Sequence, residues 1–312
     1  MIRFRAFSKH YGPHRAVDDL TFTVGRGEIV ALLGPNGSGK TTSIKAAAGL
    51  IRPSSGEVLL GEPGRPAGDP TARRIASFMP QKVTFPDSLS GREVVEFYRA
   101  LRALDRARVD AVLRFASLNG AGDRLVGTYS GGMVQRLGLA VAMLPEAPIL
   151  LLDEPTAALD PDGLCAFYSL LDERKGAGAT VFFSSHQMGD VERLADRFAI
   201  LVEGRLVAAF TQRELSARLA DRGLMRVRLD RRPEGLLERV RAVAPKALWA
   251  VDELIVPGPA SMRPAVLDLV RETGVEIRGL TADEGRLDAF YRELVGQGMT
   301  AGESRHEGTR NE

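Results

Sequence analysis

Eight residues near the N-terminus, GPNGSGKT at 34–41, have the composition and spacing of a phosphate-binding loop. Small residues let backbone N–H groups turn inward around phosphate oxygens, and the side chain of Lys40 can reach the outer phosphates. The hydroxyl of Thr41 is a suitable Mg²⁺ ligand, and a helix that begins near Lys40 adds its positive N-terminal end. The loop therefore predicts binding of a nucleoside triphosphate together with Mg²⁺.

Two adjacent carboxylates, Asp153 and Glu154, follow the apolar run ILLL at 149–152. A carboxylate at the end of a buried strand can hold Mg²⁺ directly or through water, and its neighbour can accept a proton from an attacking water. We therefore predict that Asp153 binds the metal and that Glu154 is the catalytic base. The alternative is that both residues only cap the helix that follows.

These residues need a scaffold that brings them together. The runs at 28–34, 149–153 and 180–185 are short and apolar, and they are separated by helical sequence. Continuous apolar strands that alternate with helices are typical of a parallel sheet covered on both faces. The predicted fold class is α/β, and residues 86–145 are expected to form a helical subdomain inserted into this core.

Composition limits the classes of function. Among 312 residues, 42 Lys and Arg stand against 40 Asp and Glu, so no excess of positive charge favours a nucleic-acid partner. The single cysteine, Cys165, excludes an internal disulfide, and we expect it to be a buried thiol. The sequence has no apolar core of a signal peptide and no apolar run of about 18 residues. A cytosolic chain is expected, and any membrane-spanning part would belong to a partner.

The motifs, taken in order, resemble those of the ATP-binding-cassette (ABC) ATPases over residues 2–211. Besides the phosphate loop (Walker A) and ILLLDEP (Walker B), the chain contains FMPQK, YSGGMVQR, ALD and FFSSHQ. The resemblance implies a P-loop ABC ATPase core that uses ATP and Mg²⁺, with Glu154, His186 and Lys40 as catalytic residues. The residues expected to hold ATP are Tyr11, which would stack on adenine, and Gly34, Pro35, Asn36, Gly37, Ser38, Gly39, Lys40, Thr41 and Thr42. The residues expected to hold Mg²⁺ are Thr41, Gln81 and Asp153.

The resemblance also explains a second glycine pair, in YSGGMVQR at 129–136. In similar proteins each ATP lies between Walker A of one subunit and this signature motif of the other. Ser130, Gly131 and Gly132 would then approach the γ-phosphate in trans, with a hydroxyl, backbone N–H groups and a helix N-terminus. One copy of each motif per chain implies a homodimer of cassettes. Tyr129 and Met133 replace the Leu and Gln that are most common in the family.

Beyond residue 211 the family resemblance fades, and local patterns predict a second domain at 223–296 beside an ABC domain at 1–217. Alternating or short apolar runs predict strands, and apolar faces at helical spacing predict helices. The predicted elements are strands at 225–230, 248–251, 254–256 and 275–280 and helices at 234–243, 264–273 and 287–295. The order is that of a small α+β, ferredoxin-like domain. Residues 297–312 are expected to be a disordered tail.

The resemblance implies the ATP-hydrolysing motor subunit of an ABC membrane transporter, peripheral on the cytoplasmic face of the inner membrane beneath an integral permease. The alternative is a soluble ABC ATPase that acts on DNA or ribosomes. Such proteins carry a long coiled-coil insertion or two fused cassettes, whereas only 90 positions separate Lys40 from Ser130 here.

A finer resemblance lies in TTSIKAAAGLIRPSSG, KVTFPDSLSGRE, TYSGGMVQRLGLAVAML and LDAFYREL. These segments are similar to the ATPase of the exporter that serves maturation of the copper centres of nitrous oxide reductase. This resemblance implies a periplasmic accessory protein as a further partner. Direct copper binding is not expected, because one cysteine and four scattered histidines offer no set of soft ligands. Exporters of drugs, lipids or polysaccharides are the alternatives.

Overall fold

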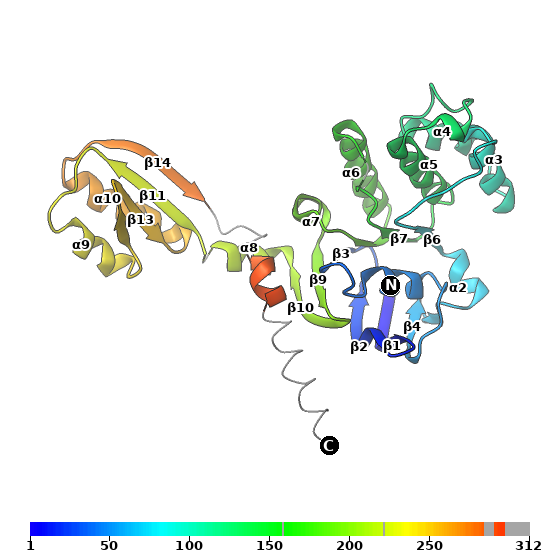
Figure 1. Ribbon diagram of the computed structural model, residues 1–312, viewed down its shortest axis with the longest axis horizontal. Helices are drawn as coiled ribbons and strands as arrows, with labels where there is room; N and C mark the ends of the chain where they lie inside the picture. The colour runs from blue at the N-terminus through cyan, green and yellow to red at the C-terminus, as the bar shows by residue number, and fades with distance from the viewer. Residues whose placement is uncertain (158, 221, 284–289, 297–312) are drawn as a thin grey trace, which may run out of the picture. The chain divides into compact units, whose positions relative to one another are not determined.

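The computed structural model describes residues 1–157, 159–220, 222–283 and 290–296. Within these ranges the chain divides into two compact units, Met1–Ala209 and Phe210–Gly296 (Figure 1). The boundary expected at residue 217 falls inside α8 (Gln212–Ala220), which belongs to the second unit. Each unit has a hydrophobic core of its own.

A six-stranded sheet forms the centre of the first unit. Its strands lie in the order β10 (Arg205–Thr211), β9 (Arg197–Val202), β3 (Ile29–Leu33), β8 (Thr180–Ser184), β7 (Ile149–Asp153) and β6 (Ala76–Met79). The strands from β9 to β6 run parallel, and β3, β7 and β8 are buried along their whole length. Because parallel strands end at the same edge, the residues that follow β3, β7 and β8 come together there.

Helices connect these strands. α1 (Lys40–Ala47) follows β3, α6 (Pro161–Gly176) lies between β7 and β8, and α7 (Met188–Leu194) lies between β8 and β9. The N-cap of α6 is Asp160, whose carboxylate accepts a hydrogen bond from the N–H of Gly163 at 2.9 Å. Asp153, which ends β7, and Glu154, which follows it, are therefore not the caps of this helix.

The expectation of a buried Cys165 is wrong, because its side chain is exposed. α6 buries Gly163, Phe167 and Leu171, which are spaced four residues apart on one helical face. Cys165 lies two positions from Gly163 and from Phe167, and two residues correspond to about 200° around a helix. The thiol therefore belongs to the opposite face of α6.

An antiparallel sheet packs against the parallel one, and sequence patterns did not predict it. Its strands lie in the order β2 (His14–Val24), β1 (Ile2–Tyr11), β4 (Ser55–Leu60) and β5 (Arg65–Pro66), and α2 (Pro70–Arg74) follows. Phe4 of β1 lies in one hydrophobic cluster with Ile44 of α1 and Phe182 of β8. The hairpin of β1 and β2 ends with Tyr11 opposite His14. This sheet therefore carries Tyr11 to the edge of the phosphate loop.

Three helices, α3 (Gly91–Leu101), α4 (Ala107–Phe115) and α5 (Gly131–Met143), lie together on one side of the first unit in Figure 1. They share a cluster that contains Val95, Leu113 and Leu137, together with Val126 of the short helix η1 (Val126–Thr128). Reciprocal hydrogen bonds between Ser90 and Glu93 cap the start of α3. This packing determines where the N-terminal end of α5 lies.

After α8, the second unit continues with an antiparallel sheet and two helices that pack with it. Its elements are β11 (Leu224–Leu229), α9 (Leu236–Val243), β12 (Leu248–Ala250), β13 (Glu253–Pro257), η2 (Ala260–Met262), α10 (Arg263–Glu272) and β14 (Ile277–Asp283). The strand order is β12-β13-β11-β14, and the inward residues of β11 pack with α9 and α10.

Residues 290–296 are helical. The start of the helix predicted at 287–295 and the tail predicted at 297–312 lie outside the described residues. In the parts of the chain that the structure describes, no helix combines the length and the apolar composition needed to cross a bilayer.

Candidate functional site

The loop between β3 and α1 depends on glycine. Gly37 and Gly39 have φ angles of 82° and 99°, in the left-handed region that favours glycine. A Cβ atom on Gly39 would lie 2.4 Å from the carbonyl oxygen of Ala16, so a side chain is excluded there. The loop borders a cavity of about 390 Å³. The cavity is lined by Tyr11, His14, Ala16, Asn36, Gly37, Ser38, Gly39, Lys40, Thr41, Thr42, Gln81 and Glu154.

The ammonium group of Lys40 lies against the start of this loop. Its Nζ donates hydrogen bonds to the carbonyl oxygens of Gly34 at 2.7 Å and Pro35 at 3.0 Å. Burial lowers the pKa of Lys40, while the nearby carboxylates of Glu154 and Asp153 oppose this shift. A phosphate group in the cavity would supply the negative charge that the neutral carbonyl partners lack.

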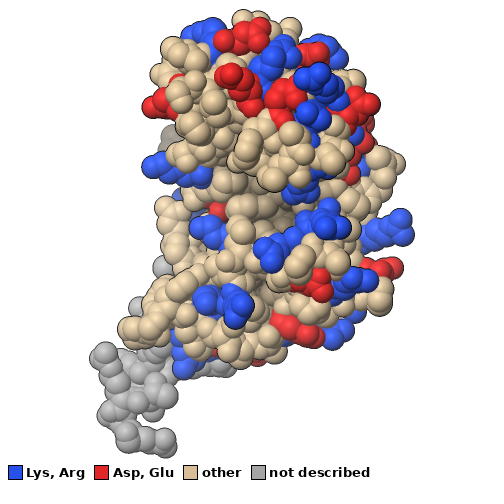
Figure 2. Space-filling model, turned by 90° about the vertical axis from the view of Figure 1, so that its right-hand side faces the viewer, with Lys and Arg blue, Asp and Glu red and all other residues tan. Residues whose placement is uncertain are grey.

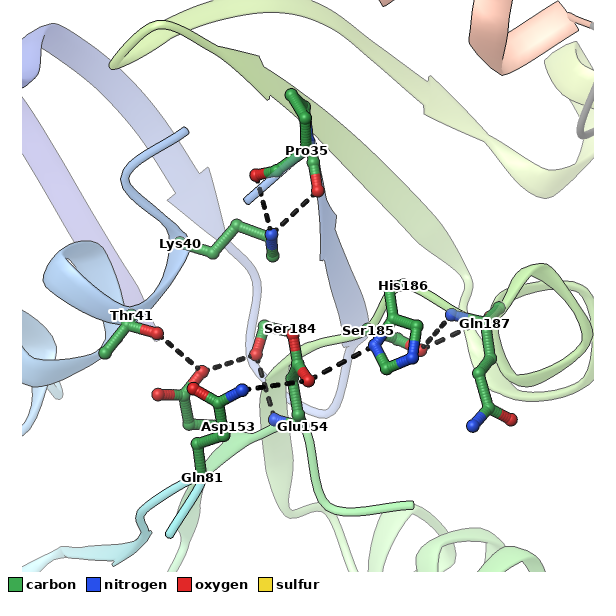
Figure 3. Close-up of polar contacts among 11 residues, drawn as sticks. Pro35, Lys40, Thr41, Gln81, Asp153, Glu154, Ser184, Ser185, His186 and Gln187 are labelled. Carbon is green, nitrogen blue, oxygen red and sulfur yellow. Dashed lines mark hydrogen bonds and ion pairs between the residues drawn. The ribbon is translucent and has the colours of Figure 1, made fainter. Parts of the chain in front are cut away.

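Two strand ends and the phosphate loop meet at Asp153 (Figure 3). Its Oδ1 accepts hydrogen bonds from the hydroxyl of Ser184 at 2.6 Å and from that of Thr41 at 3.2 Å. Its Oδ2 is buried and has no hydrogen-bond partner among the described residues. A buried carboxylate oxygen without a donor is costly unless a cation or a proton compensates it. The pair of Thr41 and Asp153 therefore fits Mg²⁺, which prefers oxygen ligands.

Glu154 lies beside this pair and receives contacts from two other segments. Its Oε2 accepts a hydrogen bond from Nε2 of Gln81 at 3.1 Å and lies 3.2 Å from Nδ1 of His186 (Figure 3). Its backbone has a φ of 49°, which is uncommon for a residue other than glycine. Its N–H donates to the hydroxyl of Ser184 at 2.9 Å. The structure thus brings Gln81, Glu154 and His186 together.

The signature residues form a separate feature at the start of α5. The hydroxyl of Ser130 accepts a hydrogen bond from the N–H of Met133 at 3.3 Å and caps the helix. A Cβ atom on Gly131 would meet nothing within 4 Å, so the helix N-terminus is accessible. Within the described residues, Ser130, Gly131 and Gly132 do not line the cavity formed by the phosphate loop of the same chain.

Comparison with known proteins identifies the family. The model of a family described as ABC transporter matches residues 17–157. The chain is 38% identical over 211 residues to the uncharacterised ABC transporter ATP-binding protein YxlF of Bacillus subtilis, over 66% of this chain and 69% of that protein. It is 31% identical to the daunorubicin resistance ATP-binding protein DrrA3 of Streptomyces coeruleorubidus, over 92% of this chain and 93% of that one. The chain belongs to the ABC transporter ATP-binding proteins.

Solved structures agree with this family assignment. The ABC cassette is 30% identical to a solved ATP-binding subunit of an ABC transporter, with a TM-score of 0.64 over 70% of this chain and 92% of the other. It is 25% identical to the ATP-binding cassette MJ0796, solved as a dimer with ADP and Pi, with a TM-score of 0.63 over 68% and 99%. The predictions of an ABC fold, of ATP binding and of ATPase activity are confirmed at the level of the family.

Sequence reasoning missed three residues of this site. His14 and Ala16 line the cavity, and the hydroxyl of Ser184 links the carboxylate of Asp153 to the backbone N–H of Glu154. Two of the three had signals in the sequence. His14 directly follows the Gly-containing two-residue turn after Tyr11, and Ser184 ends an apolar strand that must neighbour the strand of Asp153. Neither signal is specific without knowledge of the strand pairing.

Proposed function

We propose that this ABC cassette is the ATP-hydrolysing motor of an exporter. Nucleotide binding follows from the cavity beside β3. Tyr11 would stack on adenine, and the N–H groups of the loop together with Lys40 would hold the phosphates. The residues assigned to ATP are Tyr11, Gly34, Pro35, Asn36, Gly37, Ser38, Gly39, Lys40, Thr41 and Thr42.

Hydrolysis would take place beside the two carboxylates. Thr41 and Asp153 would hold Mg²⁺, and when bound the ion would neutralise charge on the phosphates. Gln81 could contribute its amide oxygen to the ion while its Nε2 stays on Glu154, so one side chain would touch both groups. Glu154 would accept the proton of the attacking water, and His186 would orient that water against the γ-phosphate.

A homodimer would complete each site. The supporting observation is that Ser130, Gly131 and Gly132 present an open helix N-terminus that does not face the cavity of their own chain. In a symmetric dimer this end of α5 would cover the γ-phosphate held by the other subunit. The dimeric state in which cassette MJ0796 was solved supports the same assembly.

A permease would contact the face shown in Figure 2, where a hollow lies between α3 and the core, with basic side chains near it. The hollow has a volume of about 240 Å³ and is lined by apolar residues such as Leu50 and Phe78, together with Arg73 and Arg102. Leu101, the last residue of α3, directly precedes Arg102 and is 70% exposed. An apolar hollow with exposed apolar side chains beside it is typical of a protein contact. With a permease as the partner, the cassette would lie peripherally on the cytoplasmic face of the inner membrane.

We further propose that the second unit is a ferredoxin-like domain. Its β-α-β-β-α-β order and its antiparallel sheet, with the first strand between the third and the fourth, are those of that fold.

Two cargo classes have support. The motifs similar to the exporter ATPase of nitrous oxide reductase maturation favour a role in assembling those copper centres, with a periplasmic accessory protein as a partner. Relatives with names in antibiotic resistance or Nod factor export favour an organic molecule instead. The relative that spans 92% of this chain carries a drug-resistance name, and this favours a drug-like cargo as the second candidate.

Substitution of Glu154 by Gln tests the ATPase and the dimer together. Loss of the base should lower turnover by about 10²–10⁴-fold, while ATP stays bound. Gel filtration with Mg-ATP should then show a dimer, and Ser130→Arg should abolish that dimer because the larger side chain blocks the helix N-terminus. Normal hydrolysis by Glu154→Gln, or a monomer at all ATP concentrations, contradicts the proposal.

The cargo is tested in the native host. A Glu154→Gln strain grown anaerobically on nitrate should accumulate nitrous oxide and contain a reductase with a defective copper centre. The same strain should show normal sensitivity to anthracyclines. A fully active reductase, combined with increased drug sensitivity, would instead assign the cassette to drug export.

A further inference from the structure

Lys9 lies beside Tyr11 on β1 and contacts its ring. The Nζ atom of Lys9 is 5.0 Å from the centre of the Tyr11 ring, within the range of a cation–π interaction. The same Nζ donates a hydrogen bond to the carbonyl oxygen of Arg52 at 3.0 Å. Arg52 belongs to the segment between α1 and β4. The ammonium group is therefore held between a backbone carbonyl and an aromatic ring.

The backbone on both sides of Lys9 is attached to that same segment. The carbonyl oxygen of Ser8 accepts a hydrogen bond from the N–H of Ser54 at 2.8 Å. The N–H of His10 donates to the hydroxyl of Ser54 at 3.0 Å. These contacts fix the position of the Lys9 backbone, so its ammonium group has a defined location relative to the phosphate-loop helix.

Tyr11 itself has few restraints. It ends the strand at the tip of a hairpin, and 48% of its surface is exposed. Among the described residues, no hydrogen bond holds its hydroxyl, and Lys9 is the charged group on its ring. Tyr11 lines the nucleotide cavity, whereas Lys9 does not. The cation therefore contacts the ring without lining the cavity itself.

We propose that Lys9 is a positioning residue for the nucleotide base and acts through Tyr11. By holding the ring in one orientation, Lys9 reduces the side-chain freedom that Tyr11 must lose when adenine stacks on it. Contact with a cation also reduces the negative potential of the ring's π-system. This inference rests on the proposed stacking of adenine on Tyr11.

Titration calorimetry of the full chain tests the proposal with two probes, ATP and inorganic triphosphate, each with Mg²⁺. Lys9→Met keeps the length of the side chain and removes its charge. We expect it to raise the Kd of ATP about two- to fivefold, the size of an exposed cation–π contact. The Kd of inorganic triphosphate should not change, because that probe has no base. Lys9→Arg should restore the affinity for ATP, because the guanidinium group also interacts with the ring.

A second background separates this inference from the stacking proposal. In Tyr11→Leu the affinity for ATP should fall, and adding Lys9→Met should cause no further loss. An equal loss of affinity for both probes in Lys9→Met would overturn the inference, because Lys9 would then act through net charge or through the fold. Unchanged ATP affinity in Lys9→Met, with a loss in Tyr11→Leu, would also overturn it but leave the stacking intact. Unchanged ATP affinity in Tyr11→Leu would remove the stacking proposal itself.

Discussion

Ser184 offers a quantitative test of how the side chain of Asp153 and the backbone of Glu154 are held in place. It is fully buried, and its hydroxyl donates to Oδ1 of Asp153 at 2.6 Å and accepts from the N–H of Glu154 at 2.9 Å. Ser184→Ala removes both contacts, although Thr41 still donates to the same Oδ1. A hydrogen bond to a charged group contributes about 1.5–3 kcal/mol, and a buried donor left without a partner costs about 1–3 kcal/mol. Taking the lower part of each range, we expect the first unit to lose about 3 kcal/mol of unfolding free energy.

Urea denaturation followed by two signals measures this loss. Far-UV circular dichroism reports mainly on the larger first unit, whereas fluorescence of the single tryptophan, Trp249, reports on the second. Ser43→Ala is the matched control, because Ser43 is also fully buried but donates only to the carbonyl oxygen of Gly39, four residues earlier. The control should lose about 1 kcal/mol or less. If both variants unfold at the same urea concentration, the support assigned to Ser184 does not exist.

Three further predictions test other parts of the cassette. Because burial lowers the pKa of Lys40, the folded state disfavours its ammonium form. Without nucleotide, the wild type should therefore gain thermal stability relative to Lys40→Met as the pH rises from neutral to about 10. If the melting temperatures of the two proteins change in parallel with pH, this linkage between the Lys40 proton and folding is excluded. Gly39→Ala should weaken ATP binding and lower stability more than Gly37→Ala, because both have positive φ but only Gly39 faces a carbonyl oxygen at 2.4 Å. Tyr129→Phe should cost about 0.5–1.5 kcal/mol in denaturation experiments through loss of its hydrogen bond to Ala121, and Gly91→Ala should be more harmful in the wild type than in a Tyr129→Leu background.

The centre of the fold could be predicted because short segments determine it. The strands expected at 28–34, 149–153 and 180–185 agree with β3, β7 and β8 to within one residue. Fully buried parallel strands require continuous apolar runs, and such runs are visible without knowledge of their partners. The helix after the phosphate loop begins at Lys40, as expected.

The N-terminal sheet could not be predicted, because its strands lack a simple period. The pairing of β1 with β2 has register shifts between Phe4 and Phe7 and again on both sides of Lys9, so apolar and polar residues do not alternate along β1. Its other partner, β4, lies about 50 residues further along the chain. The exposure of Tyr11 at the cavity depends on this pairing, and a local pattern contains no information about it.

Around Glu154, too, the residue types could be predicted from the sequence, but their contacts could not. The sequence identified the residue types that the chemistry needs, but Gln81, Glu154 and His186 come from three separate segments. The expected contact of Gln81 was with Mg²⁺, whereas its amide nitrogen donates to Glu154 in this structure. A glutamine side chain has a donor and an acceptor, so motif order alone could not decide which partner each atom takes.

The tyrosine of the signature motif, Tyr129, is compatible with the fold only because position 91 is a glycine. The hydroxyl of Tyr129 donates to the carbonyl oxygen of Ala121 at 2.7 Å, and a Cβ atom on Gly91 would lie 2.3 Å from that hydroxyl. A tyrosine at position 129 therefore requires a residue without a side chain at the start of α3. Burial raises the pKa of the phenol, so the hydroxyl keeps its proton and continues to donate at neutral pH. A leucine could fill the space but could not donate this hydrogen bond. In this cassette the residue before Ser130 is thus bonded to the segment at Ala121 and packs against the start of α3. The position of Ser130 therefore depends on these two segments as well as on α5.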